Sequence, residues 1–156
     1  MLPIAELLAA LDYSPRLIVS MVHEARPEIL KRRPAPNEWS IHELACHVAH
    51  VHPLFFSRLD LILREDHPLI RPYNPGEDDA PDTLLKMDLG ASLDLMVSER
   101  ARLLALLKVL PPKAWERTAE HPEYARYSIF IMFRHLVLHD QMHAYSIEEL
   151  LLKRDW

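Results

Sequence analysis

The chain has 156 residues, of which 49% are hydrophobic and 26% charged, and its formal net charge is −5 at pH 7. This length and composition predict a single domain over residues 1–156 with a substantial core. The negative charge and the lack of a long basic run argue against nucleic-acid binding, and no uninterrupted apolar stretch is long enough to predict a membrane span.

The first segment lacks the basic start of a signal peptide and reaches Glu6 after only five residues. Apolar side chains then recur at helical spacing and predict a helix over about residues 3–25. Within it, Ser14 and Pro15 resemble an N-cap followed by proline at the first helical position. This pair predicts a kink or break near residue 13.

The clearest helix start in the chain is the capping box formed by Ser40 and Glu43. It predicts a second helix that ends near Arg64. Pro53 lies inside this helix and removes one backbone hydrogen bond, so we expect a kink there.

Four of the ten histidines lie on the second helix. His47 falls in its core row, His50 could line the same pocket, and His42 and His52 are expected at the surface. Cys46 is the only cysteine, so an internal disulfide is impossible. We expect a buried thiol and a reducing, cytoplasmic location.

A long proline-containing loop over residues 65–81 should join the second and third helices. Such loops often carry function, although a solvated crossover is the simpler interpretation. Asp82 or Thr83 can cap the third helix, which should run to about Val109. Arg100 interrupts its apolar row, and the pattern favours a side chain that reaches solvent over one that pairs with a buried acid.

A short helical turn is expected around Trp115, and Ser128 should cap a fourth helix that runs to about Leu152. Four amphipathic helices without a strand series predict an all-α four-helix bundle. Apolar side chains on several faces of the last helix exceed one core stripe and favour a homodimer. They are Phe130, Ile131, Phe133, Val137 and Leu138.

Three histidines form a candidate metal site. His139 and His143 are four residues apart, so they share one helical face and can bind one ion. His47 would add a third imidazole from another helix, as in other bundle metal sites. Three imidazoles with open positions are typical of catalytic zinc, although imidazole also suits nickel, iron and copper. The alternative is a group of core histidines bonded to neighbouring side chains.

The sequence does not decide the roles of two residues near this group. His135 lies four residues before His139 and could be a fourth ligand, which would favour a closed structural site, or a polar residue near the bundle end. Asp140 could bond a partner next to the ligands or face water.

Several motifs together resemble the DinB-like superfamily of four-helix bundles. Residues 34–40 (PAPNEWS) are similar to the P-x-P-x-x-W-S motif that precedes the family's second helix. The family's first histidine follows that tryptophan by eight residues, and here that is His47. The segment from His139 to His143 (HDQMH) matches the closing H-D-x-x-H motif. The resemblance implies a metal held by His47, His139 and His143.

The resemblance also implies a function. It favours a metal-dependent thiol S-transferase that acts on small electrophiles, with zinc or nickel and a low-molecular-weight thiol, in a homodimer. The alternatives are a metal-dependent hydrolase and a non-enzymatic, stress-associated bundle with a structural metal. The chain departs from the family at His50, where an acidic residue is common, and at Ser146 and Ile147, where a glutamine often stands. These departures concern the substrate and leave the three histidines intact.

Overall fold

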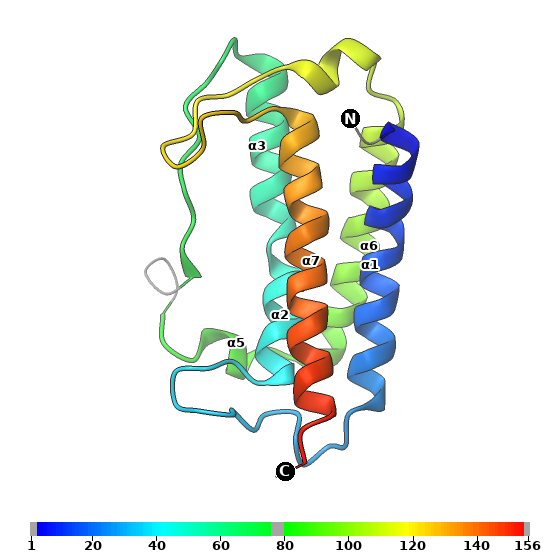
Figure 1. The fold of residues 1–156 in the computed structure, drawn as a ribbon, viewed down its shortest axis with the longest axis vertical. Helices are drawn as coiled ribbons and strands as arrows, with labels where there is room; N and C mark the ends of the chain where they lie inside the picture. The colour runs from blue at the N-terminus through cyan, green and yellow to red at the C-terminus, as the bar shows by residue number, and fades with distance from the viewer. Residues whose placement is uncertain (1–2, 76–79, 155–156) are drawn as a thin grey trace.

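The computed structural model describes residues 3–75 and 80–154, and these form a bundle of helices (Figure 1). The long segments are α1 (Ile4–Glu24), α2 (Ile41–His50) continued by α3 (His52–Arg64), α6 (Leu89–Lys108) and α7 (Ile129–Leu151). Two short helices are α5 (Thr83–Lys86) and the 3₁₀ helix η1 (Pro112–Glu116). Over the described ranges, β-pairing is limited to isolated bridges. The predicted all-α four-helix bundle is therefore confirmed.

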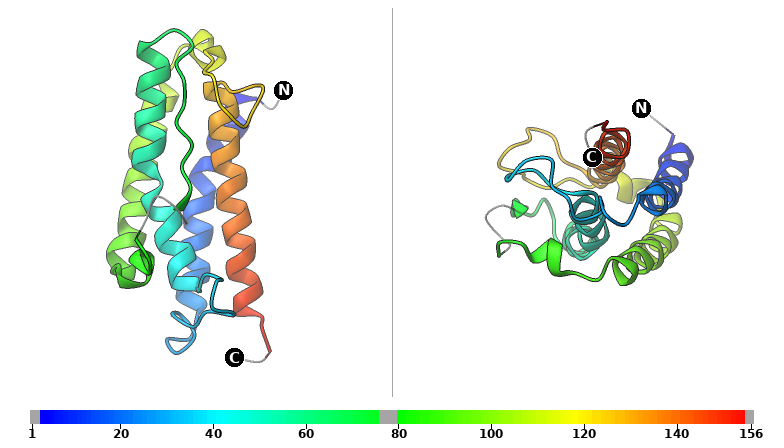
Figure 2. Two further views of the ribbon diagram at one scale, coloured as in Figure 1. Left: turned by 90° about the vertical axis from the view of Figure 1, so that its left-hand side faces the viewer. Right: turned by 90° about the horizontal axis from the view of Figure 1, so that it is seen from below.

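The helices follow a down-up-up-down order in Figure 1. α1 packs against α6 and α7, and α2 packs against the same two helices. Consequently α1 and α7, the first and last helices, are parallel neighbours. The segment after α3 returns from one end of the bundle to the other before α6 begins (Figure 2). It is the long loop expected between the second and third helices, and it acts as a crossover.

The start of α2 follows the sequence signal. The Ser40 hydroxyl accepts a hydrogen bond from the Glu43 backbone N–H at 3.3 Å, and the Glu43 carboxylate accepts one from the Ser40 backbone N–H at 3.0 Å. Arg33 also donates to Glu43 and ties the preceding connection to the helix. Two residues before Pro53 the helix is interrupted at Val51, which separates α2 from α3.

The predicted break near residue 13 was wrong, because α1 continues through Pro15. A proline cannot donate to the carbonyl four residues earlier, which here belongs to Leu11. The guanidinium of Arg100 donates to that carbonyl instead, at 2.8 Å. A side chain from a neighbouring helix thus replaces the missing backbone bond.

The third helix also begins later than predicted. Asp82 has a left-handed backbone with φ of 58° and no capping hydrogen bond, and α5 ends after a single turn. The side chain of Asp88 accepts a hydrogen bond from the Ala91 N–H at 2.7 Å and caps α6. The expected helix is therefore two helices that meet at Met87 and Asp88.

Two apolar clusters fill the bundle, one toward each end. Between them lie four buried polar residues, one from each long segment; this polar layer consists of Ser14, His52, Arg100 and Asp140. On α1, for example, Ser14 separates Leu11 of one cluster from Ile18 of the other. None of the described helices is both long and apolar enough to cross a membrane.

The bundle buries most of the apolar side chains that favoured a homodimer. Phe130, Phe133 and Val137 are buried, Ile131 is half-buried, and Leu138 alone of the five is exposed. The connections at that end of the bundle cover part of α7, and the Trp115 ring packs 6.3 Å from the ring of Phe133. Phe130, Ile131, Phe133 and Val137 therefore belong to the core, and of the five residues only Leu138 is left to contact a partner.

Candidate metal centre

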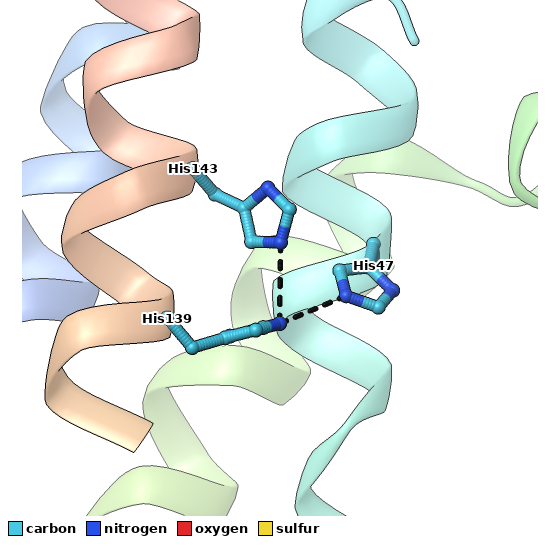
Figure 3. A group of neighbouring side chains, drawn as sticks. All are labelled: His47, His139 and His143. Atoms are coloured by element: carbon cyan, nitrogen blue, oxygen red, sulfur yellow. Dashed lines mark hydrogen bonds between the residues drawn. The ribbon is translucent and has the colours of Figure 1, made fainter. Parts of the chain in front are cut away.

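Three imidazoles meet between α2 and α7 (Figure 3). The Nε2 atom of His139 lies 2.9 Å from Nε2 of His47 and 3.2 Å from Nε2 of His143. His139 and His143 are one turn apart on α7, and His47 faces them from α2. The nitrogens all lie within 4.8 Å of one another, so one ion could contact all three.

The spacing of these nitrogens suits a single divalent ion. Zinc binds imidazole nitrogen at about 2.0–2.1 Å, and tetrahedral ligands at that distance lie about 3.3 Å apart. The two short separations, 2.9 and 3.2 Å, are close to this value. In the described part of the chain, no other histidine, cysteine or acidic residue joins the group.

The surroundings keep these imidazoles in the neutral form that metals require. Burial, together with the neighbouring His143 and His139, lowers the pKa of His47 to about 3. Burial and His139 lower the pKa of His143 to about 4. Both side chains are therefore available as ligands at neutral pH.

Trp39 covers one side of the three histidines. Its ring lies 4.8 Å from that of His47 and 6.1 Å from that of His143. A groove of about 370 Å³ lined by Trp39, Leu44, Met142 and His143 opens beside the cluster. The histidines thus combine shielding by an aromatic ring with access for a small molecule.

Arg100 lies inside the bundle, and the expectation that it reaches solvent was wrong. Its side chain is 2% exposed and its Nη1 donates to Asp140 at 2.8 Å. Its Nε donates to Nε2 of His52 at 3.1 Å. Within the polar layer, Arg100 and Asp140 thus form a buried ion pair, and His52 accepts a further hydrogen bond from Arg100.

His52 is buried rather than at the surface, for a reason that the sequence contains. Pro53 cannot donate to the carbonyl of Ala49, four residues earlier. The Nδ1 atom of His52 donates to that carbonyl at 3.0 Å, which leaves Nε2 to accept from Arg100. Burial and the charge of Arg100 lower the pKa of His52 to about 4.

Asp140 connects the polar layer to the histidines. Its Oδ1 lies 3.8 Å from Nδ1 of His139, and neither atom has a hydrogen-bond partner. This distance is too long for a hydrogen bond but places the carboxylate beside the ring. Burial would raise the pKa of Asp140, yet the adjoining His139 and the charge of Arg100 together lower it. The sequence left two roles open for Asp140, which could bond a partner next to the ligands or face water. Because Asp140 is buried and pairs with Arg100 beside His139, the structure supports the first role.

Other candidate residues lie apart from the cluster. His50 is exposed and its Nε2 is 3.3 Å from the Ser92 hydroxyl. The ring of His135 packs 5.7 Å from that of Tyr124. Cys46 is buried as expected, and burial raises the pKa of its thiol.

The surface position predicted for His42 was wrong. This side chain is buried, and its Nε2 lies 3.1 Å from the carbonyl oxygen of Leu84. The contact holds α5 against α2. His42 is therefore a packing residue, which the sequence could not show because its partner is 42 residues away.

The metal-free protein should lose stability as the pH falls from about 6.5 to about 4. Unfolded imidazoles bind protons near pH 6.5, whereas burial keeps His47, His52 and His143 neutral in the folded state. At these pH values the unfolded chain binds more protons than the folded one, so the free energy of unfolding decreases as the pH is lowered. For one such imidazole the total decrease is on the order of 3 kcal/mol. The lowered pKa of Asp140 preserves its own contribution until more acidic pH. Urea unfolding with a chelator at about pH 7.5 and about pH 5 measures this, and equal stabilities would contradict it.

Comparison with known proteins gives consistent matches. A family model described as the DinB superfamily matches residues 10–147. An Oceanobacillus iheyensis protein named "putative metal-dependent hydrolase" is 30% identical over 143 residues, which cover 91% of this chain and 82% of the relative. A Bacillus mycoides protein with the same description is 28% identical over 119 residues, covering 76% and 68%.

One solved structure shares the fold. YfiT from Bacillus subtilis, described as "a probable metal-dependent hydrolase with an unusual four-helix bundle topology", matches with a TM-score of 0.83 at 24% identity. The match covers 94% of this chain and 84% of that one. This likeness concerns the arrangement of the helices.

Proposed function

We propose that this chain, which belongs to the DinB superfamily, is a metal-dependent hydrolase of small molecules. The proposal rests on this family membership and on the three histidines that converge in the bundle. The observation that carries the proposal is the meeting of His47, His139 and His143 without a fourth ligand among the described residues. Three protein ligands with a remaining open position are typical of catalytic zinc sites, whereas structural sites have four.

Each side chain has a defined task in this proposal. His47, His139 and His143 would hold the ion through Nε2. Asp140 lies beside Nδ1 of His139 and would favour a positive charge there, and Trp39 would shield one side of the ion from water. A divalent ion supplies Lewis acidity, which polarises a carbonyl or phosphoryl bond and lowers the pKa of water. We propose zinc or nickel, both of which imidazole suits.

The other two expected functions have less support. The relatives named above are described as hydrolases, and nothing in their descriptions points to thiol transfer. A structural metal would be favoured by His135 as a fourth ligand, but its ring lies against Tyr124, outside the cluster.

Hydrolysis should depend on both the metal and the three histidines. The protein is stripped with a chelator, reloaded with zinc or nickel, and assayed with 4-nitrophenyl acetate, 4-nitrophenyl phosphate and a small anilide. We expect turnover of at least one substrate class at least roughly 100-fold above the metal-free protein, because the ion supplies the activation. His50→Ala is the matched control, since His50 is exposed and outside the cluster, and it should keep the activity.

A loaded protein that transfers glutathione to 1-chloro-2,4-dinitrobenzene but hydrolyses none of the three substrates would contradict the proposal in favour of thiol transfer. A loaded protein with neither activity would favour the structural metal.

We also propose that the protein forms a homodimer through the outer face of α7. We further propose that it resides in the reducing cytoplasm. Leu138, Met142 and Tyr145 are each more than half exposed. Their spacing of four and three residues places them on one stripe of the helix. Of the five residues that first suggested a dimer, only Leu138 belongs to this stripe. The buried thiol of Cys46 suits a reducing compartment.

A further inference from the structure

Exposed side chains form a regular stripe along the outer face of α7. This α7 stripe extends the three residues described above to the end of the helix and consists of Leu138, Met142, Tyr145, Glu149 and Leu152. Its members follow one another at alternating spacings of four and three residues, and its four apolar members are each more than half exposed. Such alternation is the heptad pattern by which one helix packs along another.

The buried face of α7 has the same period. Phe133, Asp140 and Ile147 recur every seven residues and are all 0% exposed. Asp140 lies two residues from both Leu138 and Met142, and two residues correspond to a rotation of about 200° around a helix. One face of α7 therefore packs into its own bundle, and the opposite face presents a heptad pattern to another helix.

A groove of about 640 Å³ lies at the beginning of α7. Buried aromatic side chains line it: Trp115, Tyr127 and Phe130. Ile131 and His135 also line it, and they continue the spacing of four and three residues back from Leu138. The groove is therefore continuous with the α7 stripe and offers an apolar surface to whatever packs along it.

The charges near the two ends of the α7 stripe are complementary. Arg126 and Arg134 line the groove against a single acidic residue, Glu116. Across the described ranges no carboxylate pairs with either arginine. Glu148 and Glu149 are exposed in the last turn of α7. The end of α7 thus carries the charge that the groove at its beginning lacks, which makes a second copy of this chain the matching occupant.

The sequence of the α7 stripe favours an antiparallel pair of helices. In a parallel pair each stripe residue faces its own copy, so Glu149 would face the partner's Glu149 and the two carboxylates would repel each other. In an antiparallel pair the helix dipoles oppose each other and Glu149 meets a different residue.

One antiparallel register matches both the apolar and the charged residues. When Met142 packs against the partner's Leu138, the heptad spacing places Arg134 opposite the partner's Glu148. The same register brings the partner's Tyr145 to His135, at the groove. A two-fold axis relates the two helices, so each of these contacts occurs twice.

We infer that two copies of this chain pair through antiparallel α7 helices, with the end of each α7 seated in the groove at the beginning of the other. This inference rests on the homodimer proposed above and names the surfaces that form it. The pairing also brings the partner to the candidate metal centre, because Met142 lines the groove beside His143.

The first test reverses charges in the zinc-loaded full chain and measures the dimer dissociation constant by analytical ultracentrifugation. Arg134→Glu and Glu148→Arg should each weaken the dimer at least roughly tenfold, because like charges then face each other twice. The variant that carries both changes should regain the affinity of the unaltered protein. Lys108→Glu and Asp94→Arg, matched reversals at exposed positions of α6, should have no effect.

The second test addresses the apolar residues and the orientation of the helices. Tyr145→Glu should be monomeric, and its circular dichroism and zinc content should be unchanged because Tyr145 is 65% exposed. A mixture of His135→Cys and Tyr145→Cys chains should form an intermolecular disulfide, since these positions face each other in the antiparallel pair. Tyr145→Cys alone should not.

The possible failures can be told apart. A monomeric mass at every concentration measured would overturn both the pairing and the proposed homodimer. A dimer that the charge reversals and Tyr145→Glu leave unchanged would overturn this geometry alone. A disulfide formed by Tyr145→Cys alone, or no recovery in the double charge variant, would overturn the antiparallel register. Hydrolysis by the same zinc-loaded proteins is measured separately, so none of these outcomes decides the hydrolase proposal.

Discussion

Replacing His139 with alanine should remove tight metal binding, from about one ion per chain to a small fraction after dialysis. His139 is the central member of the cluster, because its Nε2 lies within 3.2 Å of the Nε2 atoms of both His47 and His143. The binding free energy of structural zinc is about 10–16 kcal/mol and is shared by four ligands. The loss of one ligand should therefore cost about 3 kcal/mol, which corresponds to a roughly 100-fold weaker affinity for the ion. Elemental analysis of the dialysed protein gives the result directly.

Four other alanine variants complete this experiment. His47→Ala and His143→Ala should lose metal as His139→Ala does, whereas His135→Ala and His50→Ala should keep it. Full metal content in the first group would show that the site is misassigned. Equal loss in the His135 variant would indicate four ligands and a closed, structural site.

Removing either partner of the buried ion pair should destabilise the protein by about 3–5 kcal/mol. Arg100→Met leaves the Asp140 carboxylate buried without its cation, and both side chains are 2% exposed or less. It also leaves the carbonyl of Leu11 and the ring of His52 without a donor. Asp140→Leu leaves the guanidinium unpaired. Urea unfolding of the metal-free protein measures both losses.

The double variant Arg100→Met with Asp140→Leu should be more stable than either single variant, because an apolar pair of similar size leaves no unpaired charge. Arg64→Met is the control, since its exposed pair with Asp60 should contribute at most about 1 kcal/mol. Additive losses in the double variant would refute the coupling. They would mean that each side chain acts through separate contacts.

Some local features of the fold could be predicted from the sequence, although the break near residue 13 and the cap at Asp82 or Thr83 were predicted wrongly. The capping box at Ser40, the interruption at Val51 before Pro53 and the cap at Ser128 each depend on residues within a few positions of one another. The meeting of His47 with His139 and His143 followed from helical spacing and from the family resemblance. Their assignment as metal ligands remains a prediction that the alanine variants would test.

The polar layer was harder to predict because its contacts join distant residues. Arg100 and Asp140 are 40 residues apart, and a long cationic side chain in an apolar row suits solvent as well as a buried acid. The prolines, however, gave a local signal of these buried polar contacts. Pro15 and Pro53 each deprive a carbonyl of its partner, and Arg100 and His52 supply the replacements. A proline inside an unbroken helix thus indicates that a polar side chain comes from elsewhere.

The parallel pairing of α1 and α7 has a consequence for how the chain assembles. These two helices are neighbours in the bundle although about 100 residues separate them in sequence. Closing a loop of that length costs about 2 kcal/mol more in entropy than closing one of ten residues. A chain still emerging from the ribosome lacks α7 and hence His139 and His143, so the core and the three-histidine cluster are completed only after synthesis of the last helix. High contact order of this kind slows folding compared with an up-down bundle of equal size.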